Sequence, residues 1–199
     1  MNYISTRGNT KKLNFEEVLL KGLADDGGLY IPESIQTMSL DEINSLSNKT
    51  YQEIAFHIIK KFTGKTFPDS VLKEMIFESY KNFTNTLIAP LIEYEKDKYI
   101  MELFHGPTLA FKDIAMQLIS RMLDFILTKR DIDSTIICAT SGDTGGAAVD
   151  AFSSNSRVKL FVLLPNGKVS DVQRRMMTTV KSKNIKILSI DGTFDDCQN

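Results

Sequence analysis

The sequence predicts an α/β protein in which a helical region, residues 1–90, precedes the first part of a parallel-sheet domain, residues 91–199. Three short runs rich in apolar and β-branched residues occur in the second region: 135–139, 159–164 and 186–190. Two helical candidates separate these runs: 145–154 and 170–181. Apolar strands that alternate with helices are typical of a parallel sheet covered on both faces, so we expect a three-layer domain with right-handed crossovers.

The first ninety residues carry the signals of short helices. Four helices are expected from the residues that can start them: Asn14, Ser39, Thr50 and Pro68. Gly22 and Gly64 are expected to end the first and third of these helices. After Pro68, apolar residues recur at helical spacing and form one face: Val71, Leu72, Met75, Ile76 and Tyr80.

Charge and composition argue against several classes of protein. With 24 basic and 25 acidic residues the formal net charge is −1, and no long stretch is of one sign, so nucleic acid and an anionic membrane are poor partners. The longest apolar run, 160–164, is strand-sized, and the first eight residues lack the apolar core of a signal peptide. A soluble, cytoplasmic protein is predicted.

The cysteines and histidines indicate neither a disulfide framework nor a metal site. Cys138 lies within a predicted strand and Cys197 lies near the end of the chain. His57 and His105 have no Cys or His neighbour at metal-ligand spacing. No structural metal is expected, and His57 is assigned no chemistry.

Lys112 is the candidate catalytic residue. A helix is expected to begin near Phe111, just after His105-Gly106-Pro107, and at 100° per residue Lys112 falls in line with apolar residues of that helix. That apolar set is Met116, Ile119, Leu123 and Ile126. The polar residues share a separate arc of about 100°, and they are Asp113, Gln117, Ser120, Arg121, Asp124 and Thr128.

A lysine on the apolar face of a helix, in its first turn, is disfavoured as an ammonium by burial and by the positive end of the helix dipole. A lysine that readily loses its proton is the kind that forms Schiff bases with carbonyl cofactors. The alternative for Lys112 is a structural one, in which the stem lies along apolar surface and the ammonium reaches water.

A glycine-rich loop follows the first predicted strand of the sheet: Ser141-Gly142-Asp143-Thr144-Gly145. Its amides and the start of the next helix could together bind an anion. The loop matches neither a Walker A motif nor a dinucleotide-binding turn, which favours a smaller anion such as a carboxylate. The alternative is an ordinary turn in which Thr144 caps the helix.

A second loop, Pro165-Asn166-Gly167-Lys168, follows the next strand. Lys168 could meet an anionic substrate there, because open parallel sheets bind ligands beyond the carboxyl ends of their strands. The alternative is a solvated loop lysine. Ser170 and Gln173 have the spacing of a capping box, which would explain both residues without a function.

Taken together, these motifs resemble the N-terminal portion of the threonine synthase family of fold-type II pyridoxal-phosphate enzymes. The resemblance spans the chain and rests on five stretches: Tyr3-Ile-Ser-Thr-Arg-Gly8, Gly22-Leu-Ala-Asp-Asp-Gly-Gly-Leu-Tyr-Ile-Pro-Glu33, Glu102-Leu-Phe-His-Gly-Pro-Thr-Leu-Ala-Phe-Lys-Asp113, Ala139-Thr-Ser-Gly-Asp-Thr-Gly145 and Pro165-Asn-Gly-Lys-Val-Ser170. The lysine motif and the Gly-Gly-Leu-Tyr-Ile-Pro turn are the specific ones. The glycine loop is shared in kind with related enzymes.

The resemblance implies a cofactor, a reaction and site residues. Pyridoxal 5'-phosphate would be held covalently by Lys112, and O-phosphohomoserine and water would become threonine and phosphate. Lys112 would also be the general base. The implied substrate-binding residues are Ser141, Gly142, Thr144, Gly145 and Lys168. Asp143 would face the cofactor ring, where many relatives have asparagine; an ionised carboxylate cannot donate a hydrogen bond as an amide does.

The resemblance also implies that part of the site lies later in the sequence. The family's cofactor-phosphate loop and the partner of the pyridine nitrogen have no counterpart in these 199 residues, and a helix has barely begun at Thr193 when the sequence stops. We expect a fragment of a longer enzyme, inactive alone. The alternatives are a threonine synthase-like lyase with another substrate, or an inactive truncated binding module. The oligomeric state is not predicted.

Overall fold

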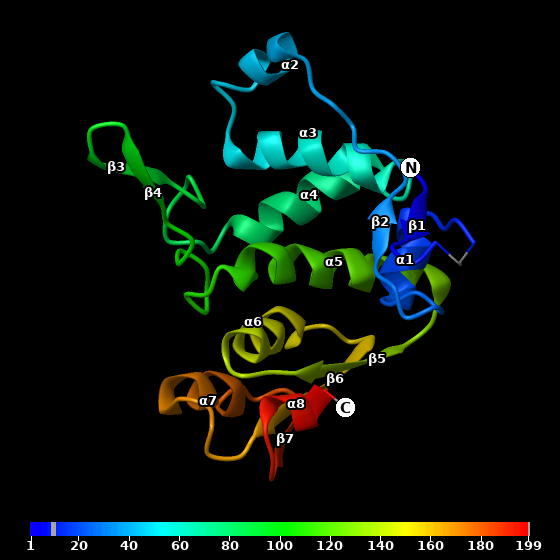
Figure 1. Cartoon of the computed structure of the whole chain (residues 1–199), viewed down its shortest axis with the longest axis vertical. Helices are drawn as coiled ribbons and strands as arrows, with labels where there is room; N and C mark the ends of the chain where they lie inside the picture. The colour runs from blue at the N-terminus through cyan, green and yellow to red at the C-terminus, as the bar shows by residue number, and fades with distance from the viewer. Residues whose placement is uncertain (9–10, 199) are drawn as a thin grey trace. The chain divides into compact units, whose positions relative to one another are not determined.

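The computed structural model describes residues 1–8 and 11–198. Figure 1 shows the course of the chain, which forms two compact units, Met1–Glu78 and Ser79–Asn199. The domain boundary predicted between residues 90 and 91 stays a prediction. None of the helices in the described part of the chain is long and apolar enough to cross a membrane. No group of three or more acidic, histidine or cysteine side chains among the described residues could hold a metal ion.

The first unit combines a small antiparallel sheet with short helices. Strand β1 (Tyr3–Ser5) pairs with β2 (Tyr30–Pro32), and Tyr3 lies opposite Pro32. The helices are α1 (Phe15–Lys21), α2 (Leu40–Ser45), α3 (Tyr51–Thr63) and α4 (Asp69–Tyr80), the last of which ends at the start of the second unit.

The predicted helix starts are confirmed by cap geometry. The side chains of Asn14, Ser39 and Thr50 each accept a hydrogen bond from a backbone amide three residues later. Gly22 and Gly64 end α1 and α3 with φ of 73° and 59°, a backbone region that favours glycine. These signals could be found from the sequence because a cap and its partner lie within one turn of helix.

Aromatic residues pack at the centre of the first unit. Phe67 is fully buried, and its ring meets that of Phe15 edge-on at a centroid distance of 6.1 Å. Tyr3 is also buried, and its hydroxyl donates to the carbonyl of Phe62 over 3.0 Å. The strand of Tyr3 is thereby tied to the end of α3.

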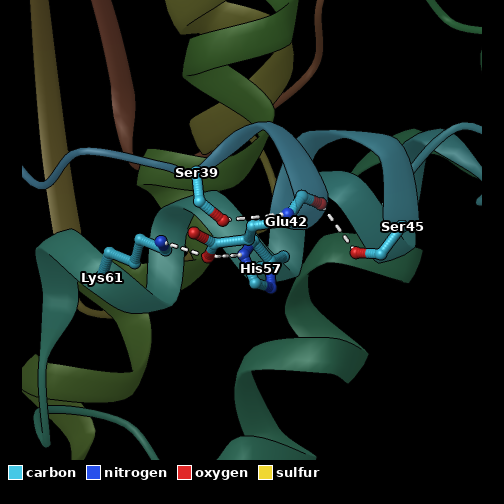
Figure 2. Close-up of polar contacts among 5 residues, drawn as sticks. All are labelled: Ser39, Glu42, Ser45, His57 and Lys61. Carbon is cyan, nitrogen blue, oxygen red and sulfur yellow. Dashed lines mark hydrogen bonds and ion pairs between the residues drawn. The ribbon is translucent and has the colours of Figure 1, made fainter.

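A carboxylate joins α2 to α3. Glu42 on α2 accepts hydrogen bonds from the ammonium of Lys61 and, over 2.7 Å, from Nε2 of His57, both on α3 (Figure 2). Ser39 caps the Glu42 amide, and Ser45 donates to the Glu42 carbonyl. The hydrogen bonds from Lys61 and then His57 hold the pKa of the Glu42 carboxyl below its ordinary 4.5.

We expect Glu42→Gln to loosen α2 at neutral pH. A carboxyl whose pKa is lowered by folding stabilises the fold above its unfolded pKa, and the contribution is lost as pH falls through the folded pKa. Amide hydrogen exchange of α2 in the full-length protein should therefore be faster in the variant at pH 7, and the difference should shrink below about pH 4. Glu74→Gln, at an exposed position on α4, is the control. Equal α2 protection at pH 7 would contradict this role of Glu42.

The second unit contains the predicted parallel sheet. Its strands are β5 (Ser134–Ala139), β6 (Val158–Pro165) and β7 (Ile185–Ile190), side by side in that order and parallel. Its helices are α5 (Lys112–Arg130), α6 (Asp143–Phe152), α7 (Asp171–Thr178) and α8 (Phe194–Gln198). α6 and α7 connect successive strands, and α5 packs against α6. The strand and helix order predicted from the sequence is confirmed.

The sheet positions the two loops that the sequence singles out. Ala139 at the end of β5 is in register with Leu163 on β6, so the loops after these strands leave the same edge of the sheet. β6 is the most buried strand, with Val158, Leu160 and Val162 inaccessible. Ile137 on β5 is 70% exposed, so the described residues leave part of the sheet uncovered.

One element was not predicted from the sequence. It is an antiparallel hairpin of β3 (Leu91–Glu95) and β4 (Lys98–Met101), with Asp97 at φ 61° in its turn. The turn carries no glycine, so the usual hairpin signal was absent. The residues of both strands are exposed.

Candidate active site

Lys112 is the first residue of α5, and its ammonium lies over an aromatic ring. Nζ is 4.2 Å from the centroid of the Phe111 ring, a distance at which the ring attracts a cation. The lysine is half-buried. Within residues 1–8 and 11–198 no carboxylate pairs with it and no acceptor receives its hydrogen bonds. The Lys112 amine therefore forms no ion pair with a carboxylate of the described residues.

Part of the polar arc of α5 is buried, together with Leu123 and Ile126 of the apolar set, which corrects the helical-wheel interpretation of a single buried face. Gln117 and Ser120 are buried, whereas Ile119 from the apolar set is exposed. Gln117 donates to the Asp150 carboxylate of α6 over 2.6 Å. Burial raises the pKa of Asp150, although the Gln117 hydrogen bond opposes the shift. Because α6 supplies polar partners to this side of the helix, the wheel alone does not show that Lys112 is buried.

Asp113 fixes the loop that leads to Lys112. Its side chain is completely buried and accepts hydrogen bonds from the Thr108 amide over 2.8 Å and the Thr108 hydroxyl over 2.6 Å. Gly106 lies so close to Asp113 that a Cβ there would collide with the carboxylate. The backbone before Lys112 is therefore held against the first turn of its own helix.

His105 also has a structural setting. Its Nε2 lies 2.7 Å from Glu102 Oε2 and its Nδ1 lies 3.2 Å from the Thr84 hydroxyl. The Phe104 ring packs beside the imidazole at a centroid distance of 4.7 Å. Both ring nitrogens are thus engaged in holding the loop, and no chemical role follows for His105.

The glycine loop is organised by Thr140, which the sequence analysis did not single out. Thr140 is 1% exposed, and its Oγ1 accepts hydrogen bonds from the amides of Gly142, over 3.0 Å, and Gly145, over 2.9 Å. Gly142 has φ 148° and precedes α6 as its N-cap, with no side-chain cap. The alternative in which Thr144 caps the helix is therefore wrong, because the helix begins one residue earlier.

Helix α7 covers the loop. A Cβ on Gly142 would collide with the Gln173 side chain, and a Cβ on Gly145 would lie 2.5 Å from the Met177 sulfur. Gln173 donates through Nε2 to the Asp143 carboxylate over 2.6 Å. Ser170 does cap the Gln173 amide, but the Gln173 side chain reaches Asp143, so the capping-box interpretation is only half right. Asp143 acts here as an acceptor, as an ionised carboxylate does.

The loop presents unpaired amides at the start of α6. Thr140 occupies the amides of Gly142 and Gly145, whereas those of Ser141, Asp143 and Thr144 have no acceptor in the described part of the chain. Amides at a helix N-terminus, where the dipole is positive, favour an anion. The donors available to a carboxylate are thus Ser141, Asp143 and Thr144 rather than the two glycines.

Lys168 lies in the exposed loop after β6. Hydrogen bonds from Thr193, helped by the charge of Lys168, lower the pKa of Asp196 in α8. No hydrogen bond among the described residues joins the Lys168 side chain to the glycine loop. Its predicted substrate-binding role stays a prediction.

The starts of α5 and α6 lie on the same side of the second unit (Figure 1), and the two helices pack against each other. Two sets of hydrogen bonds organise the glycine loop. The amides of Gly142 and Gly145 donate to Thr140, and the Gln173 side chain donates to Asp143. Within the described part of the chain, Lys112 has no bond to any of these residues. The arrangement places an amine without an ion pair at the start of α5 and a loop with unpaired amides at the start of α6.

The chain is similar to known proteins over its whole length. A family model described as the threonine synthase N terminus matches residues 2–80. Threonine synthases of Pseudomonas aeruginosa and Schizosaccharomyces pombe are 47% and 38% identical, each matching all of this chain and 42% and 40% of the relative. The crystal structure of PLP-bound threonine synthase from Brucella melitensis superposes with a TM-score of 0.94 at 47% identity, and covers 100% of this chain and 43% of that one.

The fold and the site therefore define an α/β protein with a lysine at the start of one helix and a glycine loop with unpaired amides at the start of the next. With the sequence and structural matches, the chain belongs to the threonine synthase family and corresponds to the N-terminal portion of its members. It spans about two-fifths of the length of the curated relatives it matches.

Proposed function

We propose that the full-length protein is a threonine synthase, which converts O-phosphohomoserine and water to threonine and phosphate. The observation that carries the proposal is Lys112, a half-buried lysine without an acidic partner among the described residues, in a chain that matches threonine synthases from end to end. A cytoplasmic location and a small-molecule substrate are part of the same proposal.

The residues present fit pyridoxal 5'-phosphate as the cofactor. A covalent link to the cofactor aldehyde needs an accessible primary amine, and the Lys112 amine is not paired with a carboxylate within the described residues. When bound, this cofactor supplies an electron sink that stabilises carbanions next to the substrate nitrogen. We propose that Lys112 holds it and that Asp143, oriented by Gln173, faces its ring.

The glycine loop would bind the substrate carboxylate. We propose that the amides of Ser141, Asp143 and Thr144 donate to it, and that Gly142 and Gly145 contribute shape, because their own amides donate to Thr140. The amine of Lys112, once released from the cofactor, would accept and return protons at the substrate carbons. Lys168 is proposed to bind the phosphate group of the substrate.

Residues 1–199 alone are proposed to be inactive. They span 42% of the Pseudomonas aeruginosa relative, and the sequence contains no counterpart of the family's cofactor-phosphate loop. An assay of threonine formation therefore requires the full-length protein, because the remaining residues would complete the cofactor site.

Substrate specificity tests the proposed function. The full-length protein, reconstituted with pyridoxal phosphate, should release phosphate from O-phosphohomoserine and form threonine in equal amounts. Phosphoserine and homoserine are the matched controls, since the first is one methylene shorter and the second lacks the phosphate; both should be turned over at least 100-fold more slowly. Preference for phosphoserine, or phosphate release without threonine, would favour a threonine synthase-like lyase with another substrate.

A further inference from the structure

A pocket of about 410 Å³ lies among α2, α3 and α4, wholly within the first compact unit. Leu46 at the end of α2 and Phe56 on α3 give it apolar walls, and Gln52, Lys49 and Lys73 add polar groups. This size and lining are typical of small-molecule sites. We propose that the pocket binds a small organic carboxylate with an apolar body. The proposal does not rest on the proposed function.

One wall of the pocket is held by the Glu42 contacts. His57 lines the pocket, and its Nε2 is bound to Glu42 on α2 (Figure 2). The same carboxylate also accepts a hydrogen bond from the Lys61 ammonium. Because His57 and Lys61 lie on α3, these contacts keep the end of α2, which carries Leu46, next to α3. The pocket is therefore formed before a ligand arrives, which lowers the entropic cost of binding.

The pocket has an excess of positive charge. The Lys73 ammonium lies 4.8 Å from the centroid of the Phe56 ring, and within the described residues no carboxylate pairs with it. Glu53 is the acidic residue of the lining, but its Oε2 accepts from the amide and hydroxyl of Thr50, the cap of α3. Its other oxygen is 3.5 Å from Lys49. The lining thus contains two lysines and one carboxylate, and that carboxylate already accepts the hydrogen bonds of the helix cap.

These groups determine the chemistry of the ligand. A carboxylate near Lys73 would supply the missing counter-charge, and the edge of an aromatic or branched body would fill the space against Phe56 and Leu46. A charge without an apolar body would leave those walls uncovered, and an apolar body without a charge would gain no ion pair with Lys73. Both parts are therefore needed.

The test uses the full-length protein and three matched probes, titrated by calorimetry and by ligand-observed NMR. The probe 4-ethylbenzoate carries both parts, 4-ethylbenzyl alcohol lacks the charge, and acetate lacks the body. We expect saturable binding of 4-ethylbenzoate, with each of the other two at least about tenfold weaker. The proposal would be overturned if 4-ethylbenzoate showed no saturable binding at concentrations up to about 10 mM, or if the alcohol bound equally well.

Variants of Lys73 test whether the carboxylate binds in this pocket. Lys73→Met keeps the apolar stem and removes the charge, so the affinity for 4-ethylbenzoate should fall about tenfold, whereas Lys73→Arg should retain most of it. Lys65→Met, at an exposed lysine outside the lining, should change nothing. Unchanged affinity in folded Lys73→Met, or an equal loss in Lys65→Met, would show that the carboxylate binds elsewhere and would refute the site.

Discussion

Replacing Lys112 by alanine in the full-length protein should abolish threonine formation and the visible absorbance of bound pyridoxal phosphate. The side chain is half-buried and makes no hydrogen bond or ion pair with the described residues, so its removal should cost little stability. The loss would instead be chemical, because the proposed covalent attachment and the proton transfers depend on one amine. A general base of this kind contributes about 10²- to 10⁴-fold to the rate, and turnover should fall by at least that range.

Two further variants separate the chemistry of Lys112 from its charge. Lys112→Arg keeps a cation at the start of α5 but cannot form the covalent link, so it should be as inactive as the alanine variant. Lys159→Ala, at an exposed position on β6, should retain full activity. Borohydride reduction followed by peptide mapping should place the cofactor on Lys112. A reduced adduct on another lysine, or retained absorbance in Lys112→Ala, would contradict the assignment.

The parts of the fold that could be predicted from the sequence are those with short-range causes. The caps at Asn14, Ser39 and Thr50 bond within one helical turn, and the strands of the sheet are runs rich in apolar residues, so both are visible in a linear pattern. The hairpin of β3 and β4 was missed because its exposed strands have no buried alternation and its turn has no glycine.

The supports of the candidate site depend on contacts between residues far apart in sequence. Gln173 reaches Asp143 across thirty residues, and nothing in the Ser170 to Gln173 spacing distinguishes that contact from a local capping box. The helical wheel groups the polar residues of α5 on one side of the helix, but it does not show what that side contacts. Only the packing of α6 shows that Gln117 is hydrogen-bonded to Asp150. Thr140 had one usable signal, a hydroxyl that immediately precedes a glycine-rich turn.

The neighbouring glycines at the start of α6 should respond in opposite ways to alanine. A methyl group on Gly145 would lie 2.5 Å from the Met177 sulfur and 2.6 Å from Thr140 Cγ2, whereas the nearest atom to a methyl on Gly146 is 3.9 Å away. Gly145→Ala should destabilise the full-length protein by about 1–3 kcal/mol through overpacking. Gly146→Ala should be neutral or stabilise it by about 0.5–1 kcal/mol, because alanine loses less backbone entropy in a helix.

The same pair tests whether the loop geometry matters for the substrate. Met177 can move its flexible end, but displacing the Thr140 side chain would break its hydrogen bonds to Gly142 and Gly145 and turn the loop amides away. Gly145→Ala should therefore raise KM for O-phosphohomoserine, and Gly146→Ala should leave it unchanged. An unaltered KM in a folded Gly145→Ala variant would contradict the proposal that the loop holds the substrate carboxylate.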